Sequence, residues 1–145
     1  MVAGVDDELR VRRVLEAYFF AVDAQQRQTI RDCFREEARA TLHFGTRLEQ
    51  TLTGADSIAE RIFKGCKRFD ASNHTLSNLK MEIAGSKAAA STFAIAHVVI
   101  GTEIQVRGLR YDDVLVCEHG IWRIDQRLHT PRWQYNAAAI LPELN

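Results

Sequence analysis

The second half of the chain contains four long strand-like segments joined by very short links, and this pattern constrains the fold more than any other feature. The links contain Gly85, Gly101 and Gly120, and glycine readily adopts the backbone of a tight turn. Consecutive strands joined by such short links run antiparallel. The sequence therefore predicts an antiparallel meander, with strands over 75–84, 88–100, 106–118 and 121–130.

The first half of the chain is predicted to be mainly helical. Apolar residues from Val11 to Val22 recur at the spacing of one helix face. Thr53, followed three residues later by Asp56, indicates the start of a later helix, which Thr53 would cap. Gly45 is expected to end a strand. In order, we predict a helix over 6–24, a short helix over 29–34, a hairpin of 39–44 and 48–52, and a helix over 53–68.

This order of elements predicts an α+β fold, in which a curved antiparallel sheet wraps around three N-terminal helices as a cone or barrel and encloses one pocket. The 145 residues have the size of one domain, with a core over 8–133 and a tail over 134–145. The strand over 106–118 is apolar on both faces, whereas one face of an antiparallel sheet normally meets water. We therefore expect a second subunit, or the tail, to cover the back of the sheet.

Charge and composition exclude several classes of protein. Lys plus Arg number 19 and Asp plus Glu number 19, so the zero net charge argues against a nucleic-acid binder. No apolar stretch approaches the roughly 18 residues that cross a membrane, and the N-terminus turns acidic at once, unlike a signal peptide. The three cysteines are far apart, which favours reduced, inert thiols and a cytoplasmic location.

The sequence carries no pattern typical of a metal or cofactor site. Its histidines lack the close spacing of metal ligands, and it has no Cys-x-x-Cys pair. Its glycines are isolated and form no phosphate-binding loop. We therefore predict a protein that works without metal or cofactor.

Asp23 and His74 form the strongest candidate site. Asp23 lies near the end of a predicted helix, where the helix dipole disfavours a negative charge, so it needs a partner or is simply exposed. His74 lies in the polar stretch 71–78, just before a predicted strand, where a loop histidine is the alternative. An aspartate that holds an imidazole makes a general base that works near neutral pH. If the fold brings the pair together in a closed pocket, we predict that the protein is a lyase or an isomerase.

The sequence offers four further candidates for this site. Tyr18 is either a core side chain or a hydrogen-bond donor to a substrate oxygen. Phe19 is a candidate for the pocket wall. His97 shares strand parity with apolar residues, so it is a core histidine or a substrate contact. Arg132 is a surface residue or an anchor for a substrate oxygen.

The remaining aromatic and histidine side chains of the last strands are assigned by parity and neighbours. Trp122 is predicted to face inward together with Ile124 and Leu128. His119 and His129 are predicted to be exposed, because the first lies in a turn and the second has charged neighbours.

Four segments in sequence order resemble the SnoaL-like branch of the nuclear-transport-factor-like (cystatin-like) superfamily, over about 8–133. They are Tyr18-x-x-x-x-Asp23, Asn73-His74-x-x-x-Asn78, Arg110-Tyr111-Asp112-Asp113 and Gly120-Ile121-Trp122-Arg123-Ile124. The resemblance implies an α+β cone. It also implies a homo-oligomer, a trimer or a dimer.

The same resemblance implies an activity. In similar enzymes (scytalone dehydratase, bile-acid dehydratases and hexachlorocyclohexane dehydrochlorinase) an Asp–His dyad drives elimination, and its members match Asp23 and His74. Tyr18 matches a tyrosine of the bile-acid enzymes. A second pocket histidine corresponds loosely to His97, and an arginine near the end of the last strand corresponds loosely to Arg132.

We therefore expect a cofactor-independent lyase, resembling a dehydratase, that acts on a small hydrophobic, cyclic or polyketide-like molecule. Two alternatives stay open at this point: an isomerase of the ketosteroid type, and a non-catalytic small-molecule carrier or small subunit of an oxygenase. Gln26 keeps the second alternative open, because many relatives carry a second acid at this position.

Overall fold

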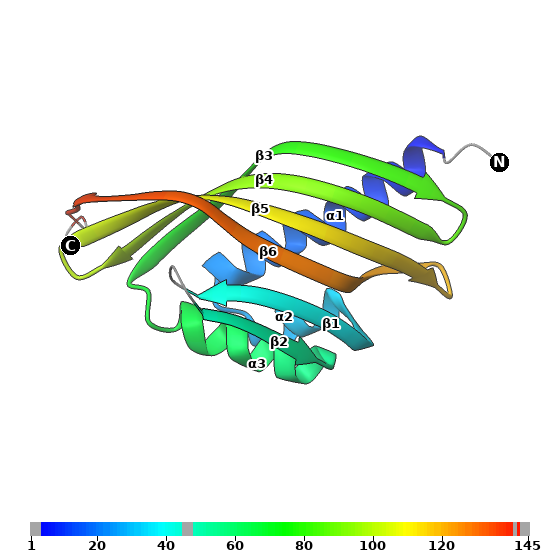
Figure 1. Cartoon of the computed structure of the whole chain (residues 1–145), viewed down its shortest axis with the longest axis horizontal. Helices are drawn as coiled ribbons and strands as arrows, with labels where there is room; N and C mark the ends of the chain where they lie inside the picture. The colour runs from blue at the N-terminus through cyan, green and yellow to red at the C-terminus, as the bar shows by residue number, and fades with distance from the viewer. Residues whose placement is uncertain (1–3, 45–47, 141, 143–145) are drawn as a thin grey trace.

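A computed structural model of the chain describes residues 4–44, 48–140 and 142 (Figure 1). Helices cover the early part of this range and long strands the later part, as predicted. Gly45, the predicted strand end, lies outside the described residues. The elements are α1 (Val5–Asp23), α2 (Arg27–Asp32), β1 (Phe34–Phe44), β2 (Leu48–Thr53), α3 (Ala55–Cys66), β3 (Ala71–Ala84), β4 (Lys87–Ile100), β5 (Glu103–Glu118) and β6 (Ile121–Ala138).

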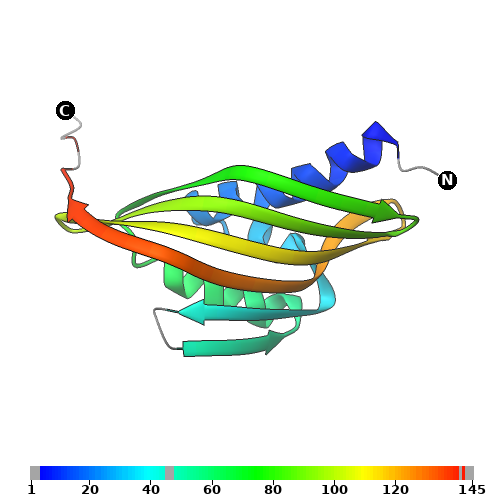
Figure 2. The same cartoon turned by 45° about the horizontal axis from the view of Figure 1, so that its top comes forward.

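The strands form one mixed sheet in the order β2-β1-β6-β5-β4-β3. The meander from β3 to β6 is confirmed, with every neighbouring pair antiparallel. The expectation of a purely antiparallel sheet is wrong at one place, because β1 runs parallel to β6 and pairs Thr41 with Leu128. These strands lie far apart in the sequence, so no turn between them could reveal their pairing. On its other side, β1 runs antiparallel to β2, and the two strands lie side by side in Figure 2.

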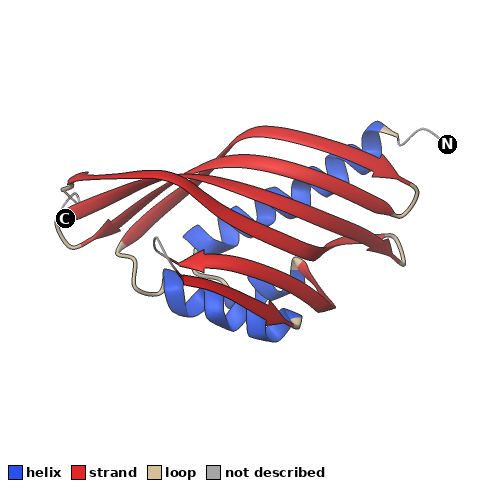
Figure 3. Ribbon diagram, in the orientation of Figure 1, coloured by secondary structure: helices blue, strands red, loops and turns tan. Residues whose placement is uncertain are grey.

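The helices pack against one side of this curved sheet (Figure 3). α1 lies against β3 and reaches β6, while α3 lies behind β1 and β2. Alternate residues of β4 are buried, and most of them are alanines, which let helices approach the sheet closely. The predicted cone is confirmed. The side chains that are least exposed include Leu15, Ile30, Phe34, Ile58, Leu115 and Ile124.

A bulge in β6 changes which side chains face the helices. Leu115 pairs with Ile124 and Val114 with Gln126, so Asp125 is an extra residue that no partner opposes. Strand parity reverses after it. Leu128, predicted to face inward with Trp122, is therefore 41% exposed, and His129, predicted to be exposed, is only 9% exposed.

A second bulge lies further along β6. Leu109 pairs with Pro131 and Gly108 with Trp133, which makes Arg132 the extra residue. The ring of Trp133 lies directly on Gly108, where a Cβ atom would come within 2.1 Å of it. Only glycine allows this close approach. The bulge thus places Trp133 on the outer face of the sheet.

Smaller differences from the sequence expectations concern the ends of elements. Thr53 belongs to β2 and caps nothing; Gly54 precedes α3 instead, with a positive φ of 96°. His74 lies inside β3, not before it. Residues 134–138 continue β6 and Tyr135 is exposed, so this part of the tail extends the sheet and does not cover its back. A second subunit on that face stays a prediction.

Among the described residues, no helix has the length and apolar character that a membrane crossing requires.

Candidate functional site

Asp23 and His74 are joined by a short hydrogen bond. Asp23 is the last residue of α1, and His74 lies on the inner face of β3 together with Ser72, two residues earlier. The Nδ1 atom of His74 lies 2.6 Å from Oδ1 of Asp23. The backbone N–H of His74 donates to Oδ2 over 2.6 Å, and the Ser72 hydroxyl donates to Oδ1 over 2.8 Å. Three donors thus satisfy a carboxylate that the helix dipole would otherwise disfavour.

These contacts determine the charge of Asp23 and the tautomer of His74. Burial acts to raise the pKa of Asp23, but the hydrogen bonds from His74 and Ser72 outweigh it, and the pKa lies below its ordinary value. An ionised Asp23 accepts from Nδ1–H, so the neutral ring keeps its lone pair on Nε2. Phe19, one turn before Asp23 on α1, stacks on the ring with centroids 6.0 Å apart. The imidazole is therefore held at one edge and on one face.

His74 also lines a cavity of about 120 Å³ between the helices and the sheet. This volume approaches the ~150 Å³ of an engineered cavity that holds benzene. Tyr18 and Val22 of α1, Cys66 of α3 and Tyr111 of β5 contribute to its wall. The cavity is enclosed largely by apolar and aromatic side chains, as small-molecule sites usually are.

Two buried phenols belong to this cavity. Burial raises the pKa of Tyr18 to about 12, against the opposing effect of the Arg127 guanidinium. Burial, reinforced by the neighbouring Tyr18, also raises the pKa of Tyr111. Both hydroxyls therefore stay protonated at neutral pH and can donate a hydrogen bond to a ligand oxygen.

A fully buried ion pair supports these aromatic rings. Arg127 of β6 donates to both oxygens of Asp113 on β5, over 2.7 and 2.8 Å, and neither side chain is exposed. The guanidinium carbon lies 4.2 Å from the centre of the Tyr18 ring and 4.7 Å from that of Tyr111. The pair thus fixes the position of both phenols at the base of the cavity.

His129 lines the cavity together with His43 and His74. The backbone N–H of His43 lies 3.4 Å from its Nδ1, and Nδ1 of His43 lies 2.5 Å from the His129 carbonyl. Burial, together with the positive charges of Arg107 and Arg127, lowers the pKa of His129 to about 3. A neutral ring that accepts at Nδ1 carries its proton on Nε2, so His129 is a second neutral donor near the cavity.

We expect the imidazole of His129 not to titrate between about pH 8 and pH 5, whereas an ordinary histidine titrates near 6.5. The measurement is an NMR pH titration of the ring carbon signals, with the His129 signal identified by its loss in His129→Gln. In urea the same signal should titrate normally, because burial is gone. A midpoint near 6 in the folded protein would contradict the buried neutral state.

Comparison with known proteins places this arrangement in a family. The family description "SnoaL-like domain" matches residues 3–128. The chain belongs to the SnoaL-like family. Curated protein sequences give no match to this SnoaL-like domain.

Solved structures share its fold at low identity. A candidate scytalone dehydratase from Novosphingobium aromaticivorans is 16% identical, with a TM-score of 0.78 over 97% of this chain and 93% of that one. The hexachlorocyclohexane dehydrochlorinase LinA-type3 from Novosphingobium barchaimii is 15% identical, with a TM-score of 0.81 over 96% and 97%. A candidate dehydratase of the NTF2-like family from Streptomyces avermitilis is 12% identical, with a TM-score of 0.77 over 88% and 97%.

The SnoaL-like domain brings together only some of the residues proposed from its sequence. Asp23, His74, Phe19 and Tyr18 meet at the cavity or directly behind it. His97 does not join them, because it has the parity of Phe93 on the outer face of β4, opposite to buried Ala96. Its side chain therefore points away from the cavity.

Arg132 does not reach the cavity of the SnoaL-like domain either. As the extra residue of the second bulge it stacks over Phe93 on the outer face, with 4.7 Å between the guanidinium carbon and the ring centre. It lies beside a groove next to the cavity instead. Neither His97 nor Arg132 lines the cavity, although Arg132 lines the adjoining groove, and a contact of either residue with a substrate stays a prediction.

Sequence reasoning missed His129 and the Arg127–Asp113 pair. His129 is predicted to be exposed because of its charged neighbours, and nothing in the sequence marks Asp125 as the bulge that turns it inward. A usable signal was present for Asp113, since the charged pair Asp112-Asp113 directly precedes the apolar run from Val114 to Cys117. Among the described residues, no group of three His, Cys, Asp or Glu side chains is arranged to hold a metal ion.

Proposed function

We propose that this protein is a cofactor-independent lyase, in which His74 removes a proton from a substrate carbon next to a carbonyl. The observation that carries the proposal is the short hydrogen bond between Asp23 and Nδ1 of His74 beside an apolar cavity. His74 lines two hollows, and Asp23 lines only the one between α1 and β3, so we infer that the ring presents Nε2 to a ligand in the cavity. Asp23 would fix the tautomer and stabilise the imidazolium that forms.

The developing charge on the substrate oxygen needs donors. Tyr18, Tyr111 and His129 line the same cavity and carry protons at neutral pH. A donor of this kind stabilises an oxyanion by several kcal/mol in a water-excluded site, roughly 3 to 4 kcal/mol where one has been measured. Loss of a leaving group from the neighbouring carbon would complete the elimination. The names of the similar structures, dehydratase and dehydrochlorinase, agree with this reaction class.

The test is a panel of small cyclic ketones that carry a hydroxyl at the β carbon, incubated with the protein in D₂O and followed by mass spectrometry. We expect the product to have lost one water, with deuterium entering recovered substrate wherever proton removal is reversible. A β,γ-unsaturated cyclic ketone in the same panel tests for an isomerase, which would move its double bond without loss of water. Binding without exchange or conversion would indicate a carrier and contradict the proposal.

A further inference from the structure

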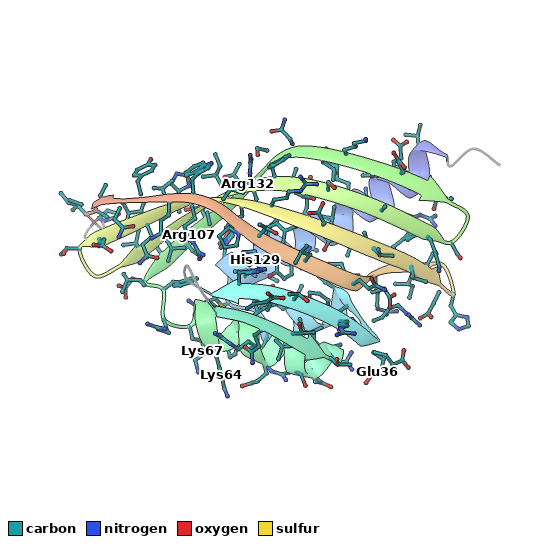
Figure 4. All side chains as sticks on the ribbon, viewed as in Figure 1. Glu36, Lys64, Lys67, Arg107, His129 and Arg132 are labelled. Carbon is teal, nitrogen blue, oxygen red and sulfur yellow. The ribbon has the colours of Figure 1, made fainter. Side chains whose placement is uncertain are left out.

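Arg107 lines the cavity, and the part of the chain that the structure describes provides no hydrogen-bond or ion-pair partner for its side chain. It shares the inner face of β5 with Leu109 and Tyr111, and Figure 4 labels it together with His129. Its Nε atom is buried and makes no hydrogen bond with any residue that the structure describes. Arg127, by contrast, has Asp113 on two of its nitrogens. Among the described residues, the buried Arg127 is therefore neutralised by Asp113, whereas Arg107, which lines the cavity, is not neutralised by an acid.

The described residues that line the cavity and its neighbouring groove provide no negative charge to balance Arg107, and Glu49, outside this lining, lies 3.8 Å from Nε2 of His43. The cavity adjoins a groove of about 280 Å³, and Arg107 and His43 line both hollows. None of the described residues that line either hollow is an aspartate or a glutamate. Asp23 and Asp113 are already engaged by His74 and Arg127. A partly buried cation without a counter-charge is costly, and a bound anion would remove that cost.

The sheet register places this cation opposite the proposed base. His74 on β3 pairs with Ala96 on β4, and Ala96 pairs with Arg107 on β5. Two strand spacings separate the backbones of His74 and Arg107, about 10 Å. On the sheet between them, the side chain of Ala96 is only a methyl group. The side chains of His74 and Arg107 shorten this distance, so that one small ring of a ligand could span the space between them.

We propose that Arg107 binds a carboxylate of the substrate, so that the substrate class is a small cyclic carboxylic acid whose acidic carbon reaches His74. The planar guanidinium matches a carboxylate by two parallel hydrogen bonds, which gives orientation as well as affinity. The cavity admits the ring, and the adjoining groove admits the charged end. The place of His74 in this arrangement rests on the proposed function, whereas the anion site rests on Arg107 alone.

The test is calorimetric titration with benzoate and with benzamide, which share a shape and differ in charge. Wild-type protein should bind benzoate about ten- to a hundredfold more tightly than benzamide, because hydrogen bonds to a charged group are the stronger ones. In Arg107→Met the preference for benzoate should disappear. In Arg110→Met, on the outer face of the same strand, it should persist, since that arginine pairs with Asp112.

Three results would overturn the proposal: equal affinity of wild-type protein for the two probes, no binding of benzoate at millimolar concentration, or a benzoate preference that survives in Arg107→Met. The first two need no variant, so a misfolded Arg107→Met leaves the test intact. Benzoate has no carbon proton next to a carbonyl for His74 to remove. Benzoate binding through Arg107 without turnover of any cyclic ketone, including β-hydroxy ketones that carry a carboxylate, would therefore contradict the lyase and leave the anion site standing.

Discussion

Turnover should fall about 100- to 10,000-fold in His74→Ala, the range that general base catalysis contributes. The substitution removes the group that would take the proton, while Asp23 keeps the Ser72 hydroxyl and the backbone N–H of residue 74 as donors. The fold should survive, because the ring is lost at the wall of a cavity and no buried charge is left without a donor. Deuterium exchange into the cyclic ketones measures the rate, and circular dichroism measures the fold.

His97→Ala is the matched control for this variant. His97 lies on the neighbouring strand but on the outer face of the sheet, so turnover should not change. Equal losses in the two variants would contradict the assignment, since they would indicate a general loss of folded protein. Full activity of a well-folded His74→Ala would refute the base itself.

Asp113→Ala should lower the free energy of unfolding by about 3 to 5 kcal/mol, the usual consequence of removing one partner of a buried ion pair. Arg127 would keep its charge in a place with no exposure and no other acid to accept its hydrogen bonds. For a domain of this size the melting temperature should fall by roughly 10 °C. Urea denaturation followed by tryptophan fluorescence gives the free energy directly.

Asp112→Ala provides the comparison on the adjacent residue. Asp112 pairs with Arg110 on the outer face, where both side chains are partly exposed, so its loss should cost about 1 kcal/mol or less. The double variant Asp113→Leu with Arg127→Leu should recover part of the lost stability, because no charge then stays buried. Similar costs for Asp112→Ala and Asp113→Ala would contradict the special position of the buried pair.

Local patterns in the sequence predict most of the elements. Helical spacing from Val11 to Val22 predicts α1, and glycine-containing links predict the meander from β3 to β6. The polar stretch around His74 and the ill-placed charge of Asp23 single out the dyad, and the family resemblance strengthens it. The structure then brings the two side chains within 2.6 Å of each other. Their catalytic role stays a prediction that His74→Ala tests.

Two bulges in β6 explain why the alternation of side chains along this strand predicts the wrong face for some residues. A single extra residue, Asp125, turns His129 inward and Leu128 outward, and Arg132 as the next extra residue ends on the outer face. A bulge depends on the pairing partner in β5 as well as on β6 itself. For this reason, alternation along one strand could not reveal it. The same limit explains the unforeseen parallel pairing of β1 with β6.

The sequence by itself determined the order of helices and strands, and the two groups that form the dyad, because helix spacing, turns and polar residues act over a few positions. Only the tertiary structure decided that His129 and Arg107 line the cavity, and that the Arg127–Asp113 pair lies buried beside its two phenols. Their inward orientation follows from strand register and from contacts between residues distant along the chain. Such contacts form only when the whole sheet closes around the helices.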